Sequence, residues 1–139
     1  MSAKIFKARH AMGPVVRGPA LVASDGFSAR YDLDRIKGIF SRPTHKLAGQ
    51  SYVGKILVLD TAKGGVATAW MLHEMKSRGI VPLALIFNRV TPILAQGAAF
   101  GDVTMVDRFD GDVTDLIQSG DEVHIDPAAG SVEILNRDM

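Results

Sequence analysis

The sequence predicts an α/β fold in which helices flank a mixed β-sheet, and two patterns lead to this class. Residues 55–59 and 82–87 are continuous apolar runs, typical of strands buried on both faces, and a segment with helical spacing separates them. Near the end of the chain, polar and apolar residues alternate, as in a hairpin with one face in water. The first pattern favours parallel and the second antiparallel pairing.

The first sixty residues are expected to form short strands and loops. Apolar pieces at 15–16 and 20–22 flank Gly18-Pro19, so we predict strand pieces joined by a bend. Residues 27–46 are rich in charged side chains and show little periodicity. That composition indicates a surface loop, where binding groups are often found.

The middle of the chain reads as strand, helix, strand, helix, strand. After the strand at 55–59, a turn of small residues leads into a predicted helix at 66–76, for which Gly79 is a suitable C-cap. A short helix is predicted from Pro92 to residue 99, because proline suits the first helical position. The strand at 103–106 completes the unit, and this succession favours parallel pairing.

A predicted hairpin closes the chain. Residues 122–126 and 131–134 alternate between polar and apolar positions, and the turn-forming residues 127–130 separate them.

Length, composition and charge exclude several classes of protein. With 139 residues, 47% hydrophobic and 22% charged, the chain is predicted to be one globular domain, 1–139. Its net charge is +1 and its charges are interspersed, so no nucleic-acid surface is expected. Without cysteine it has neither a disulfide nor a thiolate ligand for zinc or an iron–sulfur cluster. Neither a signal peptide nor a membrane span is apparent, so we expect a cytoplasmic protein.

The strongest local pattern for chemistry is the turn before the helix at 66–76. Its glycines, Gly64 and Gly65, let the backbone approach a ligand, and free N–H groups at the start of a helix favour an anion. Lys63 adds a positive charge, and Thr61 and Thr68 offer hydroxyl groups. The turn fits neither nucleotide-binding glycine motif, so a nucleotide site is not expected. The alternative is a tight turn that simply requires glycine.

Other candidate residues are scattered along the chain. The four histidines lack metal-ligand spacing, and only His45, in the polar segment, is a site candidate; His73 and His124 are expected at the surface. Asn88-Arg89 follows a buried strand, where α/β proteins place ligand groups, although it also fits the start of a polar loop. The acidic residues between 107 and 115 are interpreted as helix caps and solvated loop.

Five stretches together resemble one family, the small subunit or swivel domain of aconitase X. The likeness covers residues 13–135, and its most specific part is the Asn-x-x-x-Pro-Ile-Leu-Ala-x-Gly-Ala segment at 88–98. The other matches are Gly-x-Ala-Leu-Val at 18–22, the set Ser28, Asp34 and Gly38, the stretch 45–51 with its Gly49 and Ser51, and the Gly-Asp-x-Val ending at 120–126 with Gly130.

The resemblance implies a swivelling β/β/α domain, a mixed β-barrel or sandwich with flanking helices. In this family a large subunit carries iron or an iron–sulfur cluster, and the small subunit has no cofactor of its own. Together the two subunits act as hydro-lyases on small hydroxy acids, cis-3-hydroxy-L-proline in many bacteria and a phosphorylated mevalonate in archaea. This chain is therefore expected to be a dehydratase small subunit that works only with a large partner.

One departure from the family concerns the glycine-rich turn. The family has a serine pair there, one of which acts as the catalytic base, whereas this chain has Gly65-Val66. Neither side chain can take a proton. An alternative is therefore a non-catalytic binding or assembly subunit, and a third is an isomerase complete in this chain.

The resemblance and the local patterns together give the candidate site. The predicted substrate-binding residues are Lys63, Gly64, Gly65, Ser28, Arg30, Asn88 and Arg89, and the candidates for the catalytic group are Thr61, Thr68 and His45.

Overall fold

The computed structural model describes residues 4–27, 32–61, 66–89 and 103–136. The predicted short helix at 92–99 lies outside these ranges. The helices are α1 (Val66–Arg78) and α3 (Val113–Leu116). The strands are β1 (Lys4–Lys7), β2 (His10–Met12), β3 (Val16–Val22), β4 (Leu33–Asp34), β5 (Ile39–Phe40), β6 (Ile56–Thr61), β7 (Ala84–Arg89), β8 (Thr104–Asp107), β9 (Glu122–Asp126) and β10 (Ser131–Asn136).

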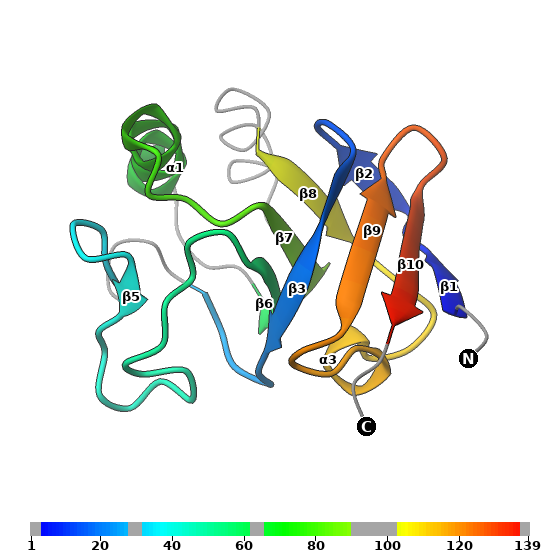
Figure 1. Cartoon of the computed structure of the whole chain (residues 1–139), viewed down its shortest axis with the longest axis horizontal. Coiled ribbons are helices and arrows are strands. Elements are labelled where there is room, and N and C mark those ends of the chain that lie inside the picture. Colours follow the sequence, from blue (N-terminus) through cyan, green and yellow to red (C-terminus); the bar gives the residue numbers. More distant parts are fainter. Residues whose placement is uncertain (1–3, 28–31, 62–65, 90–102, 137–139) are drawn as a thin grey trace.

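Eight strands form one sheet that curls until its edges meet (Figure 1). The order is β1-β10-β9-β3-β6-β7-β8-β2, so the edge strands β1 and β2 are consecutive in the chain and only two residues apart. The first of these, Ala8, donates its N–H to Gly130 O at 2.9 Å beside β10. The second, Arg9, donates to Arg108 O at 2.8 Å after β8. This short link closes the sheet into a barrel.

The predicted parallel centre and antiparallel hairpin are both confirmed. Strands β3, β6, β7 and β8 are parallel neighbours in that order, and β9 pairs antiparallel with β10. Helix α1 ends as predicted. Gly79 has a φ of +73° and donates to Lys76 O at 3.1 Å, and Ile80 donates to Met75 O at 3.0 Å. These two bonds form a Schellman C-cap.

The bend predicted at Gly18-Pro19 is wrong, because β3 runs unbroken through both residues. Residues up to Pro19 pair antiparallel with β9, and the parallel ladder with β6 begins at Ala20. Successive N–H groups of a strand point to opposite sides, and Ala20 donates its N–H to Asp121 O on the β9 side. Pro19, which has no N–H, therefore lacks one on the β6 side, at a position before the ladder with β6 begins. Gly18 lies close to Leu83: a Cβ at position 18 would sit 2.5 Å from Leu83 Cδ1, the end of an exposed side chain that would have to turn away.

The strands bury side chains on both faces, which explains the continuous apolar runs in the sequence. The barrel interior holds Ala20, Ile56, Val58, Ala84, Ile86, Val106, Val123, Ile125, Val132 and Ile134, together with Val113 and Ile117 of the α3 region. The outer face carries Leu21, Leu57, Leu59, Leu85, Phe87 and Met105, and Leu72 and Met75 of α1 pack against it.

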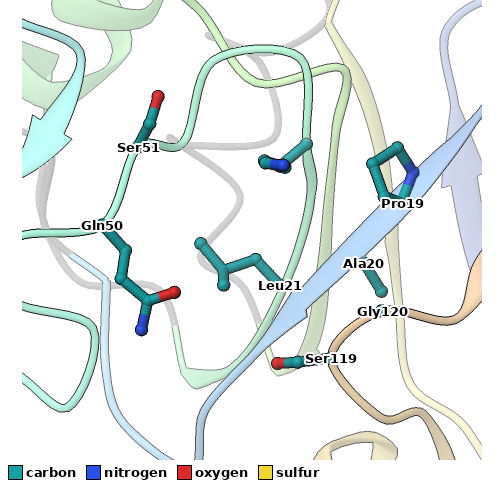
Figure 2. Close-up of a pocket in the computed structure, with 8 residues that line it drawn as sticks. Pro19, Ala20, Leu21, Gln50, Ser51, Ser119 and Gly120 are labelled. Atoms are coloured by element: carbon teal, nitrogen blue, oxygen red, sulfur yellow. The ribbon is translucent and has the colours of Figure 1, made fainter.

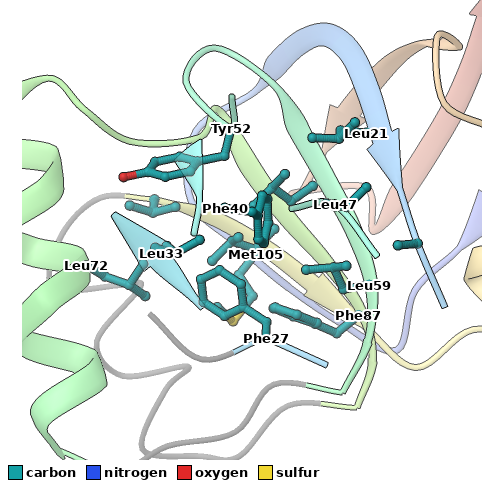
Figure 3. Close-up of a cluster of buried hydrophobic side chains, with 14 of the residues drawn as sticks. Leu21, Phe27, Leu33, Phe40, Leu47, Tyr52, Leu59, Leu72, Phe87 and Met105 are labelled. Carbon is teal, nitrogen blue, oxygen red and sulfur yellow. The ribbon is translucent and has the colours of Figure 1, made fainter. Parts of the chain in front are cut away.

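The prediction that residues 27–46 form a surface loop is wrong for its apolar members. Phe27 and Phe40 are completely buried, and Leu33 nearly so, between α1 and the outer face of the sheet (Figure 3). Two short strands, β4 and β5, pair within this segment. Leu33 and Phe40 lie opposite each other on these strands, but each strand has only two residues, too few for an alternating pattern to be seen in the sequence.

Tyr52 belongs to this outer core, and its hydroxyl is buried without a hydrogen-bond partner among the residues that the structure describes. A buried hydroxyl without a partner costs roughly 1 kcal/mol or more. We therefore expect Tyr52→Phe to stabilise the chain by ~1 kcal/mol, or roughly 2–5 °C in Tm. Thermal unfolding followed by circular dichroism measures this, and a lower Tm would contradict it.

The same substitution should change the response to alkali. Burial raises the pKa of Tyr52 to about 12 in the folded chain, above the value of about 10 expected after unfolding. Below about pH 10 the hydroxyl is neutral in both states and its ionisation costs no stability. As the pH rises from about 10 toward 12, the unfolded chain ionises first and the free energy of unfolding falls. Unfolding titrations should show a smaller alkaline loss for Tyr52→Phe than for the parent chain.

Candidate functional site

The carboxyl ends of β3, β6 and β7 lie side by side at one edge of the sheet, where parallel α/β sheets bind ligands. Beyond β3 the chain stays beside β6: Asp60 donates its N–H to Asp25 O and Phe27 donates to Thr61 O, each at 2.9 Å. The register then pairs Thr61 with Arg89 at the end of β7. Two predicted site residues, Thr61 and Arg89, are therefore neighbours on this edge.

Several predicted site residues lie outside what the structure describes. Thr68 is in α1, of whose first five residues only the backbone is described. The others outside the described ranges are Ser28, Arg30, Lys63, Gly64 and Gly65.

His45 is buried and both of its ring nitrogens are engaged. Nδ1 accepts the N–H of Leu47 at 3.0 Å, so the proton of the neutral ring is on Nε2, which donates to Gly26 O at 2.8 Å. The ring also stacks on Phe40, with centroids 4.6 Å apart. His45 would have to give up the Leu47 bond before it could take a proton.

A polar cluster that sequence reasoning missed follows β3. The Asp25 carboxylate accepts N–H bonds from Gly26 at 2.8 Å and Lys46 at 3.1 Å. Burial alone would raise the pKa of Asp25, but these backbone bonds, together with electrostatic attraction to His45 and Arg42, outweigh burial and lower the pKa below its usual value. The Lys46 ammonium donates to Ser24 at Oγ, 2.7 Å, and at O, 3.0 Å. The sequence did offer one indication of this cluster: Ser24-Asp25 comes shortly after an apolar strand, as Asn88-Arg89 does.

Asn88 is tied to three groups of the protein. Its Nδ2 donates to Asp60 Oδ1 at 2.9 Å and to Asp112 Oδ1 at 2.8 Å, and its Oδ1 accepts the Val113 N–H at 2.8 Å. Arg89, by contrast, is exposed at the end of β7. The two adjacent residues thus differ: Arg89 is open to a ligand, whereas the Asn88 amide is occupied.

The acidic residues between 107 and 115 play different roles. Asp112 is the N-cap of α3, as predicted, and accepts from Thr114 N at 2.9 Å. The prediction of a solvated loop is wrong for Asp107, which is buried at the end of β8 with its Oδ1 3.0 Å from His10 Nδ1 on β2. The Asp107–His10 pair joins strands that are distant in sequence.

A pocket of about 390 Å³ lies beside β3, away from these residues (Figure 2). Leu21 lies between Gln50 and Ser51 on one side and Ser119 on the other. Of the described residues that line the pocket, the one charged residue is Lys55, and the Ser119 hydroxyl already accepts the N–H of Val22 at 2.8 Å. No predicted site residue lines it, so the sheet edge is the better candidate site.

Neither a metal centre nor a membrane segment is found in the part of the chain that the structure describes. No group of three or more His, Asp or Glu side chains is arranged there to hold a metal ion. None of the described helices is long and apolar enough to cross a membrane.

Comparison with known proteins gives one consistent family. The model of the aconitase X swivel domain matches residues 5–134. The chain is 32% identical to the phosphomevalonate dehydratase small subunit of Methanococcoides burtonii, over 88% of this chain and 90% of that protein. It is 30% identical to the phosphomevalonate dehydratase small subunit of Methanocella arvoryzae, over 93% of this chain and 98% of that protein.

A solved structure agrees with this match. The crystal structure of Thermococcus kodakaraensis aconitase X in its holo-form superposes with a TM-score of 0.87 at 30% identity. The superposition covers 96% of this chain and 99% of that chain. The swivel-domain fold implied by the sequence resemblance is therefore confirmed.

Proposed function

Because the chain belongs to the aconitase X swivel-domain family, we propose that it forms the substrate-binding half of a two-subunit dehydratase. The family and its named relatives make the chain a hydro-lyase small subunit. The finer part of the proposal is the substrate, a small hydroxy carboxylic acid such as cis-3-hydroxy-L-proline. The partner is a separate large subunit that carries the metal centre.

One observation carries the location of the substrate site. The hydrogen bond from Phe27 N to Thr61 O joins the residues that precede two segments, 28–31 and 62–65. Five of the predicted substrate-binding residues belong to those two segments. Arg89, which is paired with Thr61, adds an exposed cation beside them. The proposed partners of the substrate carboxylate are Lys63, Arg30 and Arg89.

The chemistry proposed for this edge is removal of a proton next to the substrate carboxylate. A base takes the proton from the carbon, the electron pair of the broken C–H bond forms the new double bond, and the C–O bond breaks so that hydroxide leaves. Return of the abstracted proton to this hydroxide gives water. Lys63 and the free N–H groups at the start of α1 would stabilise the carboxylate as charge builds up on it. Thr61 and Thr68 are the proposed hydroxyl substitutes for the family serine; His45 is the third candidate.

The metal centre is assigned to the large subunit and not to this chain. A cluster bound by thiolates needs cysteines, of which this sequence has none, and the described residues offer no alternative set of ligands. The chain thus has no thiolates for an iron–sulfur cluster, and its described residues do not fit an iron centre of their own. Their proposed role is to bind and orient the acid.

A non-catalytic subunit is the second candidate function. The observation that favours it is Gly65-Val66, which stands where the family has its serine pair. In that case the chain would hold the acid, or complete the assembly, without moving the proton itself.

The test is co-expression with the large aconitase X subunit of the same organism, followed by pull-down and an anaerobic dehydratase assay. The two substrates to be tested are cis-3-hydroxy-L-proline and phosphomevalonate, and each subunit alone serves as a control. We expect a stable complex, and turnover only when both subunits are present. A complex that is inert on both acids would support the non-catalytic subunit. Turnover by this chain alone would contradict both candidates.

A further inference from the structure

The carboxamide of Asn88 is fully committed to the protein. Both of its N–H hydrogens are used, one on Asp60 Oδ1 and one on Asp112 Oδ1, and its oxygen accepts the Val113 N–H. Exchanging the nitrogen and oxygen would set the amide oxygen against two carboxylates, so the partners fix the orientation. A substrate could bind this amide only by displacing one of these three bonds.

The three bonds join elements that are far apart in sequence. Asp60 precedes Thr61, the last residue of β6, and Asp112 is the N-cap of α3. Helix α3 is itself anchored, because its first residue, Val113, and the residue that follows the helix, Ile117, are buried in the barrel interior. Asn88 therefore connects the carboxyl end of β6 to a fixed point of the core.

Among the residues that the structure describes, the Asn88 amide is the one hydrogen-bond partner of the Asp60 side chain. The backbone of Asp60 holds the end of β6 to the segment that follows β3. The Asp60 N–H donates to Asp25 O at 2.9 Å, and the next residue, Thr61, accepts the N–H of Phe27 on its backbone oxygen. A shift of Asp60 would thus be transmitted to Thr61 and to the start of the 62–65 segment.

We propose that Asn88 is a positioning residue and not a substrate ligand: through Asp60 it fixes the carboxyl end of β6, from which the substrate-binding turn begins. This inference rests on the proposed function for its effect on turnover. Its structural part, the restraint on β6, can be measured on this chain alone.

The test is Asn88→Asp in the two-subunit enzyme, together with the exchange variant Asn88→Asp/Asp60→Asn. The single variant sets a third carboxylate against Asp60 and Asp112, and we expect kcat to fall by at least about tenfold with KM changed less than about threefold. In the exchange variant, the amide at position 60 can donate to the new carboxylate, so the bond between positions 60 and 88 is restored in the reverse direction, while Asp112 still opposes that carboxylate. We expect this variant to recover part of kcat.

The matched control is Asp115→Asn, which removes one carboxylate, as the Asp60→Asn half of the exchange variant does, from an exposed position of α3 outside this network. It should leave kcat and KM unchanged. If instead Asn88→Asp raises KM alone and the exchange variant recovers nothing, Asn88 is a substrate ligand and the inference is wrong.

A second readout does not depend on activity. Hydrogen exchange of the Asp60 and Phe27 amides, measured on the full chain alone, reports the bonds that hold the end of β6 to the segment that follows β3. We expect Asn88→Asp to accelerate both by at least about tenfold, with partial recovery in the exchange variant and no change in Asp115→Asn. Unchanged exchange would overturn the inference. If exchange responds but the parent complex has no turnover on either acid, the restraint stands and only the proposed function fails.

Discussion

Replacing Lys63 by alanine is expected to lower kcat/KM of the two-subunit enzyme by about 10²- to 10³-fold, the usual cost of removing one preorganised donor to a developing negative charge. Lys63 is the one cation of the glycine-rich turn between β6 and α1. If it holds the carboxylate equally in the ground state and the transition state, the loss will appear in KM; if it acts mainly as the proton leaves, kcat will fall. Steady-state kinetics on the acid that the parent complex dehydrates distinguish the two.

The control for this prediction is Lys76→Ala. Lys76 is an exposed residue in the last turn of the same helix, so the substitution removes an equal charge at the far end of α1. We expect unchanged kinetics for it and partial activity for Lys63→Arg, which keeps the charge. Unchanged kinetics for Lys63→Ala would remove Lys63 from the site.

The parts of the fold that the sequence predicted are those with local causes. Strands β6, β7 and β8 read as apolar runs because both faces of each are buried, by the barrel interior on one side and by α1 and the 27–52 segment on the other. The closing hairpin and the Gly79 cap follow from patterns a few residues long. Such patterns need no knowledge of what lies across the fold.

The features that the sequence did not reveal depend on distant partners. Pro19 suits the interior of β3 only because β9 and β6 each pair with a different half of that strand. The link at Ala8-Arg9 closes the barrel by bonding to residues more than ninety positions away. Nothing within a window of neighbouring residues predicts either arrangement.

The candidate site shows the same division. The edge itself was predictable, because the parallel order places the ends of β6 and β7 together. The state of each side chain was not. His45 lies in a charged stretch yet is buried and bonded at both nitrogens. Asn88 and Arg89 are adjacent in a polar pair, but only Asn88 has its polar atoms committed, to partners on β6 and α3.

Replacing Phe87 by alanine is expected to destabilise the chain by about 3–5 kcal/mol, the usual range for truncating a fully buried phenylalanine. Phe87 lies on β7 one residue before Asn88, and its ring packs against that of Phe27 with centroids 5.7 Å apart (Figure 3). The truncation removes this aromatic contact and leaves a cavity between the sheet and the segment that precedes residues 28–31. Since a domain of this size has about 5–15 kcal/mol of total stability, the loss is a large part of it.

Urea unfolding followed by circular dichroism measures this change. Phe109→Ala is the matched control, because Phe109 is only partly buried against the interior cluster, and we expect it to lose less than half as much. Should Phe87→Ala fail to fold, Phe87→Leu retains most of the side-chain volume and is expected to cost about 1 kcal/mol. Equal losses for Phe87→Ala and Phe109→Ala would contradict the assignment of Phe87 to the outer core. A larger loss of unfolding free energy for Phe87→Ala than for Phe109→Ala would indicate that the segment around Phe27, which leads into the proposed substrate site, depends on packing against β7.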